Sequence, residues 1–288
     1  MSDFISFLFK TNALNICPEN SPFWYTSGKI GPYYINAEFL YGSKQDSKDL
    51  LEFINHEKEN ELELPIKLFK KIEKQYTENE IYRYVINEMK NKIEQNIDVN
   101  EIDYVSGGER RDWFFSYMIA KLLNKPHITI YKNLNSVVSD FEFTDVKPIE
   151  NIEGKNVLHV VDMINTSSSY VRAWIPVIEK LGGKIKWSIS CVDRMQGGAK
   201  VLEDRGIKCM SIVQVDKTLF DKALELNVIN KEQYNMVNEY IKNPDETMRK
   251  FLKEHPEFTC IEERTVFPFE EHYDGFYIAK LTKKSRII

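Results

Sequence analysis

The stretch Asn156-Val-Leu-His-Val-Val-Asp-Met-Ile-Asn-Thr-Ser-Ser-Ser169 decides the fold. Its apolar first half predicts a strand that is buried on both faces of a sheet and ends at Val161, with His159 as a satisfied core residue. A carboxylate, Asp162, follows, and then a hydroxyl-rich turn that can open a helix. Backbone N–H groups at a helix start bind phosphate, and a carboxylate accepts hydrogen bonds from sugar hydroxyls. The stretch therefore suits a sugar phosphate, although an ordinary strand-to-helix loop capped by Ser or Thr has the same pattern.

Strands and helices alternate on both sides of this stretch. Nearly continuous apolar runs predict strands, amphipathic segments between them predict helices, and Pro176 should kink the helix that contains it. The alternation is typical of an α/β fold with a central parallel sheet flanked by helices, in which ligands bind at the carboxyl ends of strands. The predicted strands are Ile102–Ser106, His127–Tyr131, Asn156–Val161, Lys184–Val192 and Ile207–Val215, and the predicted helices are 112–124, 169–181 and 198–205.

The chain changes in texture along its length, and we expect four regions. An aromatic, turn-rich segment comes first, and a charged helical insert follows it. The third region carries the strand–helix alternation, and the fourth is a charged extension expected to form helices packed on the core. No Gly/Ser linker and no internal repeat separates independent domains. The four regions are residues 1–43, 44–98, 99–216 and 217–288.

The insert should contain two or three helices. Ser47 can cap the first of them, and Thr77 and Glu80 have the spacing of a capping box for a later one. From Ile81 to Ile93, apolar residues recur at intervals of four and draw one stripe along a helix. The stripe either packs on the core or forms a contact between two copies of the chain.

The composition predicts a globular protein without a nucleic-acid or membrane partner. Of the 288 residues, 42% are hydrophobic and 29% are charged, a balance that argues against global disorder. The formal net charge of -5 argues against a general nucleic-acid binder, which needs a basic face. No apolar stretch reaches transmembrane length, and no signal peptide is visible. The 4 cysteines have neither CxxC nor zinc spacing, which favours isolated thiols in a reducing cytoplasm.

The deciding stretch resembles the phosphoribosyl pyrophosphate (PRPP) signature of the type I phosphoribosyltransferases. In that signature an apolar strand leads to two acidic residues, two apolar residues and a Thr/Gly/Ser turn. Asp162 matches the second acidic residue, whereas Val161 replaces the first and Ser167 replaces a Gly. The change at Ser167 matters if the position needs a positive φ or close approach of a phosphate. The resemblance implies the type I phosphoribosyltransferase fold and these PRPP-binding residues: Asp162, Asn165, Thr166, Ser167, Ser168 and Ser169.

The next strand ends in a second motif, Asp193-Arg-Met-Gln-Gly-Gly198, which is followed by Gly206-Ile207. This pattern is similar to that of the orotate phosphoribosyltransferases, and it implies that Arg194 lies beside the carboxylate of the base. A guanidinium fork is the natural partner of a planar carboxylate. The alternative is an Asp–Arg pair in a surface turn.

Upstream, the segment Ser106-Gly-Gly-Glu-Arg-Arg-Asp112 lies between a predicted strand and a predicted helix. It resembles the pyrophosphate loop of the family, which implies phosphate binding by Gly107, Arg110 and Arg111. Arg111 falls where orotate enzymes usually carry Lys. A short Gly-containing loop with two Arg residues is the plainer interpretation.

The N-terminal run Ser27-Gly-Lys-Ile-Gly-Pro-Tyr-Tyr-Ile-Asn36 resembles the hood that covers the pyrimidine in orotate phosphoribosyltransferases. The resemblance implies that Lys29, Tyr34 and Ile35 contact the base. Thr26 stands where the family commonly has a Lys. The alternative is a buried aromatic segment without a ligand.

Family members also use a mobile basic loop after the strand that matches His127–Tyr131. Lys132 keeps one basic position of this loop, which implies a catalytic role with Asp162, while Asn135 and Val137 replace a Lys and a His. The resemblance further implies a homodimer that shares its sites through this loop, and Mg²⁺ bound through pyrophosphate, with no metal-ligating residues in the chain itself.

Two hypotheses follow from these motifs. In the first, the protein transfers phosphoribosyl from PRPP to a pyrimidine base, orotate, giving orotidine monophosphate and pyrophosphate. In the second, it is a non-catalytic member of the fold that binds a nucleotide or sugar phosphate, or that acts as a regulatory partner. The hood and the Asp-Arg-Gly-Gly motif favour the first, and the replaced motif residues favour the second.

Overall fold

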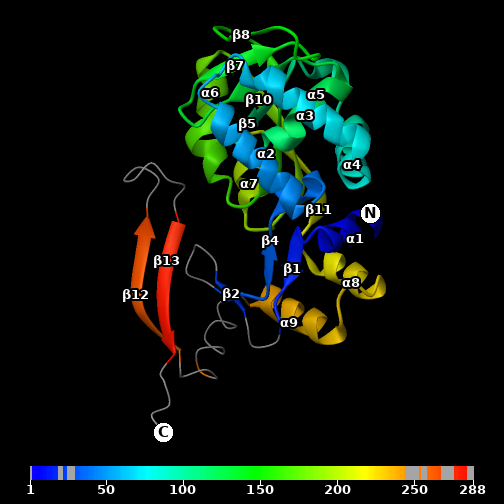
Figure 1. The fold of residues 1–288 in the computed structure, drawn as a ribbon, viewed down its shortest axis with the longest axis vertical. Coiled ribbons are helices and arrows are strands. Elements are labelled where there is room, and N and C mark those ends of the chain that lie inside the picture. The colour runs from blue at the N-terminus through cyan, green and yellow to red at the C-terminus, as the bar shows by residue number, and fades with distance from the viewer. Residues whose placement is uncertain are drawn as a thin grey trace. The chain divides into compact units, whose positions relative to one another are not determined.

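The computed structural model describes residues 2–18, 22–24, 30–243, 253, 258–266 and 276–283 (Figure 1). The chain forms two compact units. The first consists of Met1–Ala13 with Asn36–Leu219, and the second of Leu14–Ile35 with Phe220–Ile288. Among the described residues, no helix is long and apolar enough to cross a membrane.

A seven-stranded sheet forms the centre of the first unit, in the order β11-β10-β9-β5-β6-β7-β8. The five predicted strands are all present and run parallel to one another, which confirms the expected α/β architecture. Two short antiparallel strands, β7 and β8, extend the sheet at one edge. The strands are β5 (Tyr104–Gly108), β6 (His127–Ile130), β7 (Ser136–Ser139), β8 (Val146–Pro148), β9 (Asn156–Ile164), β10 (Lys184–Asp193) and β11 (Lys208–Gln214).

Strand β9 lies inside the sheet between β10 and β5, as its apolar sequence predicts. His159 is fully buried, and its Nδ1 lies 2.8 Å from Ser106 Oγ. Its Nε2 has no hydrogen-bond partner among the described residues, so the ring is only half satisfied, contrary to the prediction. Burial lowers the pKa of His159 to about 3, so the ring is neutral in the core. The strand runs on to Ile164, three residues beyond the predicted end at Val161, because β10 pairs with it up to that point.

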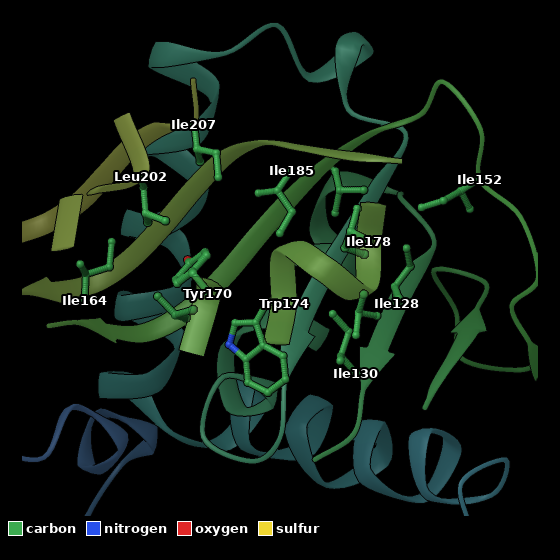
Figure 2. Close-up of a cluster of buried hydrophobic side chains, with 13 residues drawn as sticks. Ile128, Ile130, Ile152, Ile164, Tyr170, Trp174, Ile178, Ile185, Leu202 and Ile207 are labelled. Carbon is green, nitrogen blue, oxygen red and sulfur yellow. The ribbon is translucent and has the colours of Figure 1, made fainter. Parts of the chain in front are cut away.

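Helices cover both faces of the sheet. On one face α4 and α5 pack against the strands. On the other face, Tyr170, Trp174 and Ile178 join a buried apolar cluster with the sheet (Figure 2). Burying both faces in this way is what requires the nearly continuous apolar strands. The helices of the alternating region are α5 (Trp113–Leu123), α6 (Ile175–Lys180) and α7 (Gly198–Glu203).

The predicted kink at Pro176 takes a different form. A π-helical turn, Tyr170–Trp174, comes first, and α6 starts afresh at Ile175. Pro176 therefore occupies the first turn of α6, where its missing N–H leaves no hydrogen bond unmade.

The insert forms three helices, and its apolar stripe packs on the core. Ile81, Val85, Met89 and Ile93 are all buried, and α4 contacts α5, β10 and β11. The predicted caps are wrong. Ser43 caps α2 and Asn79 caps α4, whereas Ser47 is buried within α2 and Thr77 lies in the last turn of α3. The helices are α2 (Lys44–Glu57), α3 (Leu64–Glu78) and α4 (Glu80–Asn96).

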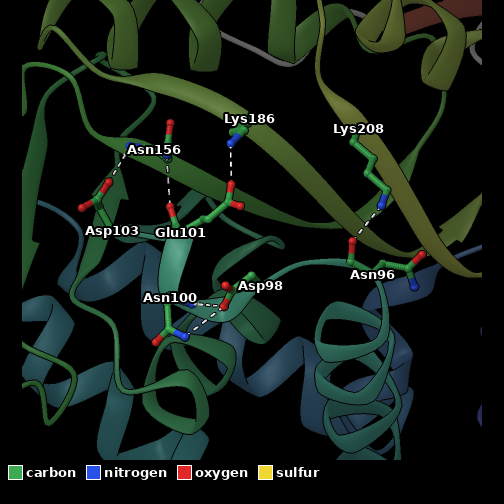
Figure 3. A network of polar contacts seen from close by, with 8 residues as sticks. All are labelled: Asn96, Asp98, Asn100, Glu101, Asp103, Asn156, Lys186 and Lys208. Carbon is green, nitrogen blue, oxygen red and sulfur yellow. Dashed lines mark hydrogen bonds and ion pairs between the residues drawn. The ribbon is translucent and has the colours of Figure 1, made fainter.

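A polar network fastens the amino-terminal ends of the strands (Figure 3). Asn156 donates its backbone N–H to Asp103 Oδ2 (2.8 Å), and Lys186 Nζ lies 2.6 Å from Glu101 Oε2. Lys208 donates to the carbonyl oxygen of Asn96 at the end of α4 (2.7 Å). These contacts lie at the amino-terminal edge of the sheet, opposite to the loops that follow β5 and β9.

The remaining elements are divided between the two units. Helix α1 and the 3-10 helices η1 and η2 belong to the first unit, and the small antiparallel pairs β1–β4, β2–β3 and β12–β13 to the second. The extension, expected to be helical, is helical in α8 and α9 but then forms β12 and β13. The elements are α1 (Ser2–Lys10), β1 (Leu14–Ile16), β2 (Phe23–Trp24), β3 (Ile30–Gly31), β4 (Tyr33–Ile35), η1 (Ala37–Tyr41), η2 (Val99–Glu101), α8 (Lys217–Glu225), α9 (Lys231–Lys242), β12 (Phe258–Val266) and β13 (Phe276–Lys283).

Candidate functional site

Strand β9 projects past its neighbour β5 at the carboxyl edge of the sheet. The pairing of β5 with β9 covers Tyr104–Ser106, whereas β10 accompanies β9 to its end. Asp162 lies on the projecting part, and its backbone N–H donates to Asp112 Oδ1 (3.3 Å). The other oxygen of the Asp112 carboxyl accepts from Gly108 N (3.2 Å). The loop that follows β5 is therefore tied to β9 by one buried side chain.

Three carboxyl groups and one guanidinium gather at this edge. Glu38, on η1, is buried, and its Oε1 lies 2.9 Å from Arg111 Nε. Burial and the charge of Glu38 raise the pKa of Asp162 to about 7, while Arg111 opposes the rise. Burial and the charge of Asp162 raise the pKa of Asp112 well above its ordinary value. Both aspartates are therefore protonated more readily than free carboxylic acids.

The hydroxyl-rich turn after β9 contains a residue with a left-handed backbone, a conformation that the sequence left open. Ser167 has φ +58°, so the position that the family fills with Gly does require a left-handed backbone. Ser167 is buried while Thr166, Ser168 and Ser169 are exposed. Among the described residues, Asn165 Oδ1 and Ser167 Oγ are buried side-chain atoms without a hydrogen-bond partner. Buried polar atoms of this kind are unusual, and these two lie in the turn that the motif assigns to phosphate.

The Asp193–Gly198 motif packs directly against this turn. Arg194 donates its backbone N–H to the Ile164 carbonyl oxygen (2.9 Å), and Gly198 N donates to the Asn165 carbonyl oxygen (2.9 Å). A Cβ on Gly198 would lie 2.3 Å from that same oxygen, which is why this position is Gly. Asp193 is buried and accepts from Met195 N (2.8 Å). The structure thus places the backbone of Arg194 next to the end of β9, directly before the turn.

The last two residues of β5 are glycines, and neither has room for a side chain. A Cβ on Gly107 would lie 2.3 Å from Ser116 Oγ, and one on Gly108 would lie 2.3 Å from the Trp174 ring. The peptide bond between Glu109 and Arg110 is cis. These two glycines let α5 and the π-helical turn approach the strand closely, so Gly107 has a packing reason that does not depend on a ligand.

Residues of the insert contact the loop that follows β5. Arg110 donates to Asn55 Oδ1 of α2 (2.5 Å). Glu109 Oε1 lies 3.9 Å from Lys58 Nζ, and Glu109 Oε2 accepts from the backbone N–H of Lys132 (2.8 Å). Glu109 thereby connects the loop after β5 with the turn after β6, and Asn55 and Lys58 connect the insert to the same loop.

The segment matched to the mobile basic loop of the family forms a tight hairpin between β6 and β7. Tyr131 N donates to the Asn135 carbonyl oxygen (2.9 Å), and Val137 is buried within β7. Glu61 fastens the tip, because its carboxylate accepts from Asn133 Nδ2 (2.8 Å) and Asn135 Nδ2 (3.0 Å). Lys132 is exposed at this tip. The short antiparallel pairing of β6 with β7 leaves too few residues for a long loop.

Comparison with known proteins shows similarity to orotate phosphoribosyltransferases. No family model matches the chain. It is 25% identical over 222 residues to the orotate phosphoribosyltransferase of Sulfolobus acidocaldarius, covering 76% of this chain and 88% of that one. Its fold matches orotate phosphoribosyltransferase from Francisella tularensis with a TM-score of 0.55 at 15% identity, over 83% of this chain and 98% of that one. It also matches Leishmania donovani UMP synthase (TM-score 0.57, 17% identity, 84% of this chain), of which it spans 42%.

The chain has the type I phosphoribosyltransferase fold. Sequence similarity over most of both chains confirms the predicted resemblance to orotate phosphoribosyltransferases. Structural matches at 15–17% identity bear on the fold alone.

The hood of this phosphoribosyltransferase fold is only partly described. Lys29 and Thr26 lie outside the described residues. Tyr34 is 39% exposed and Ile35 is buried, because neighbouring residues of a strand point to opposite faces. Tyr34 and Ile35 therefore cannot both cover one face of a single ring.

Several residues of the site could not be recognised from motifs. Glu38, Asn55 and Glu61 reach the loops from η1 and the insert, outside every matched motif. Asp112 ends the matched loop, but only its hydrogen bonds identify it as a tie to β9. Among the described residues, no group of three or more His, Cys, Asp or Glu side chains is arranged to hold a metal ion.

Proposed function

We propose that the protein transfers the phosphoribosyl group of PRPP to orotate, giving orotidine monophosphate and pyrophosphate. The relatives named orotate phosphoribosyltransferase support this reaction. The observation that carries the proposal is the turn after Asp162. It combines a carboxyl group, a left-handed Ser167 and two buried side-chain oxygens that lack partners among the described residues. The Ser167 hydroxyl can donate to a 5-phosphate oxygen, and the Asn165 amide oxygen and the Asp162 carboxylate can accept from ribose hydroxyls.

Asp162, the turn that follows it and Arg194 each have a part in the proposed reaction. Asp162 accepts hydrogen bonds from the ribose hydroxyls, and the turn at residues 165–169 binds the 5-phosphate through N–H and hydroxyl groups. Arg194 pairs with the orotate carboxylate. The bond from C1 to the pyrophosphate oxygen breaks as the bond from C1 to orotate N1 forms, through an oxocarbenium-like transition state. No side chain has to act as a nucleophile, so positioning and charge carry the rate.

Lys29 and Tyr34 stay part of the proposal as residues that contact the base, and Lys132 as a residue that stabilises the leaving group. A homodimer also stays part of it. The hairpin that carries Lys132 is held within its own chain by Glu61, so the proposed dimer does not depend on exchange of a mobile loop.

The carboxyl edge does not form a Mg²⁺ cage of its own. Its described side chains offer no cluster of three metal ligands, and Asp112 is already bonded to two backbone N–H groups. Mg²⁺ prefers oxygen ligands and often binds through one or two carboxylates together with substrate phosphates. The site therefore fits Mg²⁺ carried by PRPP, where the ion would neutralise phosphate charge, with the Asp162 carboxylate nearby.

A second function has an observation in its favour. The hairpin after β6 is pinned by Glu61, and Val137, at the position of the family's His, is buried in β7. A site without a closing basic loop could bind a nucleotide or sugar phosphate without turning it over, or serve a regulatory partner.

Calorimetric titration with PRPP, orotate and orotidine monophosphate, each with Mg²⁺, tests the proposal. We expect PRPP and orotidine monophosphate to bind and orotate to be consumed in the presence of PRPP. Binding of orotidine monophosphate without any turnover would favour the second function. If none of the three compounds binds the folded protein, the proposed function is wrong.

A further inference from the structure

Two neighbouring arginines in the loop after β5 have partners of different charge. Arg111 Nε lies 2.9 Å from the carboxylate of Glu38, a side chain that is only 6% exposed. Arg110 donates instead to the amide oxygen of Asn55, at 2.5 Å. One guanidinium is thus matched by a buried negative charge and the other is held by a neutral group.

The surroundings of Arg111 are unfavourable for an anion. Its charge also acts on the carboxyl groups of Asp112 and Asp162, which lie at the same edge. A pyrophosphate that approaches Arg111 would have to compete with Glu38 and would meet these acidic groups as well. Because the carboxylate and the guanidinium largely cancel, Arg111 offers little net attraction.

The surroundings of Arg110 are more favourable. Among the described residues, no carboxylate forms an ion pair with Arg110. The carboxylate next to it in sequence, Glu109, is engaged elsewhere, with Lys58 Nζ at 3.9 Å and the backbone N–H of Lys132 at 2.8 Å. Arg110 is therefore oriented by a neutral group, and its charge is not matched by a carboxylate among the described residues.

We propose that Arg110, oriented by Asn55 of the insert, is the loop arginine that binds the pyrophosphate group, and that Arg111 serves to neutralise Glu38. This inference rests on the proposed function, since it names the cation that faces the leaving group of PRPP. It differs from the motif match, in which Arg111 takes the position of the family's Lys. It also gives the insert a role in the site, because Asn55 is a positioning residue contributed by α2.

The first test compares the two arginines by calorimetry with Mg²⁺–PRPP and with Mg²⁺–pyrophosphate. Arg110→Gln should weaken binding of both by about tenfold or more, the usual effect of losing a charged hydrogen bond. The matched variant is the double substitution Arg111→Gln with Glu38→Gln, which removes both members of the ion pair and leaves no buried unpaired charge. We expect the double variant to lose several-fold less affinity than Arg110→Gln.

The second test keeps the geometry and changes the charge. Asn55→Asp is nearly isosteric, so it should still orient Arg110, but it gives that guanidinium a negative partner. We expect affinity for Mg²⁺–pyrophosphate to fall about tenfold while the melting temperature stays the same or rises. If Asn55 only stabilises the fold, the affinity for Mg²⁺–pyrophosphate should be unchanged in a variant that remains folded.

The outcomes separate this inference from the proposed function. If the wild type binds Mg²⁺–PRPP and the Arg111 double variant loses more affinity than Arg110→Gln, the assignment to Arg110 is overturned and the function stands. Unchanged binding in a folded Asn55→Asp variant also overturns the assignment to Arg110, because the Asp would offset the charge that binds the pyrophosphate. If the wild type binds neither PRPP nor pyrophosphate, the proposed function fails, and the assignment of Arg110 fails with it.

Discussion

Ser167 carries a conformational cost at the centre of the site. An L-residue with φ +58° is less stable than Gly there by about 1–2 kcal/mol, of which Gly returns part through its greater freedom in the unfolded chain. Ser167→Gly should therefore raise the free energy of unfolding by about 1 kcal/mol in urea titrations. Ser168→Gly is the control, because Ser168 is exposed and helical, and Gly there should lower stability. Equal effects of the two substitutions would contradict this account.

Val161 shows what a motif comparison misses at the scale of one residue. The sequence marks Val161 as a replaced acid, but the side chain is 3% exposed in the apolar cluster with Tyr170 and Trp174. Val161→Asp should therefore not restore a ribose ligand. We expect it to destabilise the protein by more than about 3 kcal/mol in urea titrations, the scale of an unpaired charge placed in a core. A stable variant with tighter PRPP binding would contradict this expectation.

Asp162 gives the protein a pH dependence with a definite sign. Its pKa in the folded state is raised to about 7, above the ordinary value of 3.8. The folded protein therefore binds the proton more tightly than the unfolded chain, so this stabilisation is complete below about pH 4 and is lost as the pH rises through 7. Asp162→Asn should flatten the fall in unfolding free energy between these pH values. Glu38→Gln should move the fall to lower pH, because it removes a charge that raises the pKa.

At the scale of elements, the insert fixes the hairpin between β6 and β7. Glu61 accepts hydrogen bonds from Asn133, Asn135 and, through its carbonyl oxygen, Tyr131 (2.8 Å). In Glu61→Ala, we expect amide hydrogens of residues 131–136 to exchange about tenfold faster, because these contacts contribute to the protection of the turn. Glu59→Ala, at an exposed position on the same connection, should leave the exchange unchanged. Faster exchange spread evenly over the sheet would indicate general destabilisation instead.

Regular elements of the core were predictable because their periodicity is local. The five parallel strands and three helices of the alternating region follow from apolar runs and stripes. The caps at Ser47 and Thr77 were predicted wrongly because Ser43 and Asn79, close by, also suit a cap and fit the actual helix starts better. Strands β7 and β8 are short and partly polar, so they resembled a loop.

At the scale of the whole molecule, contacts between residues far apart in the sequence could not be predicted from local patterns. The second unit joins an N-terminal segment to the extension, with Tyr33 packed 5.8 Å from both Phe220 and Tyr240 between ring centroids. In the first unit, Glu38 and Asn55 reach the loop after β5 from more than fifty residues away. Motif spacing identified the loops of the site, but it could not show that Arg111 is matched by Glu38.

The measurement that tests the central claim most directly is the consumption of orotate, followed by its ultraviolet absorbance, with PRPP and Mg²⁺ present. The account predicts that wild-type protein forms orotidine monophosphate and pyrophosphate in equal amounts, and that Asp162→Asn is at least tenfold slower while remaining folded. Wild-type protein that binds PRPP but leaves orotate unchanged, or an Asp162→Asn variant as fast as wild type, would contradict it.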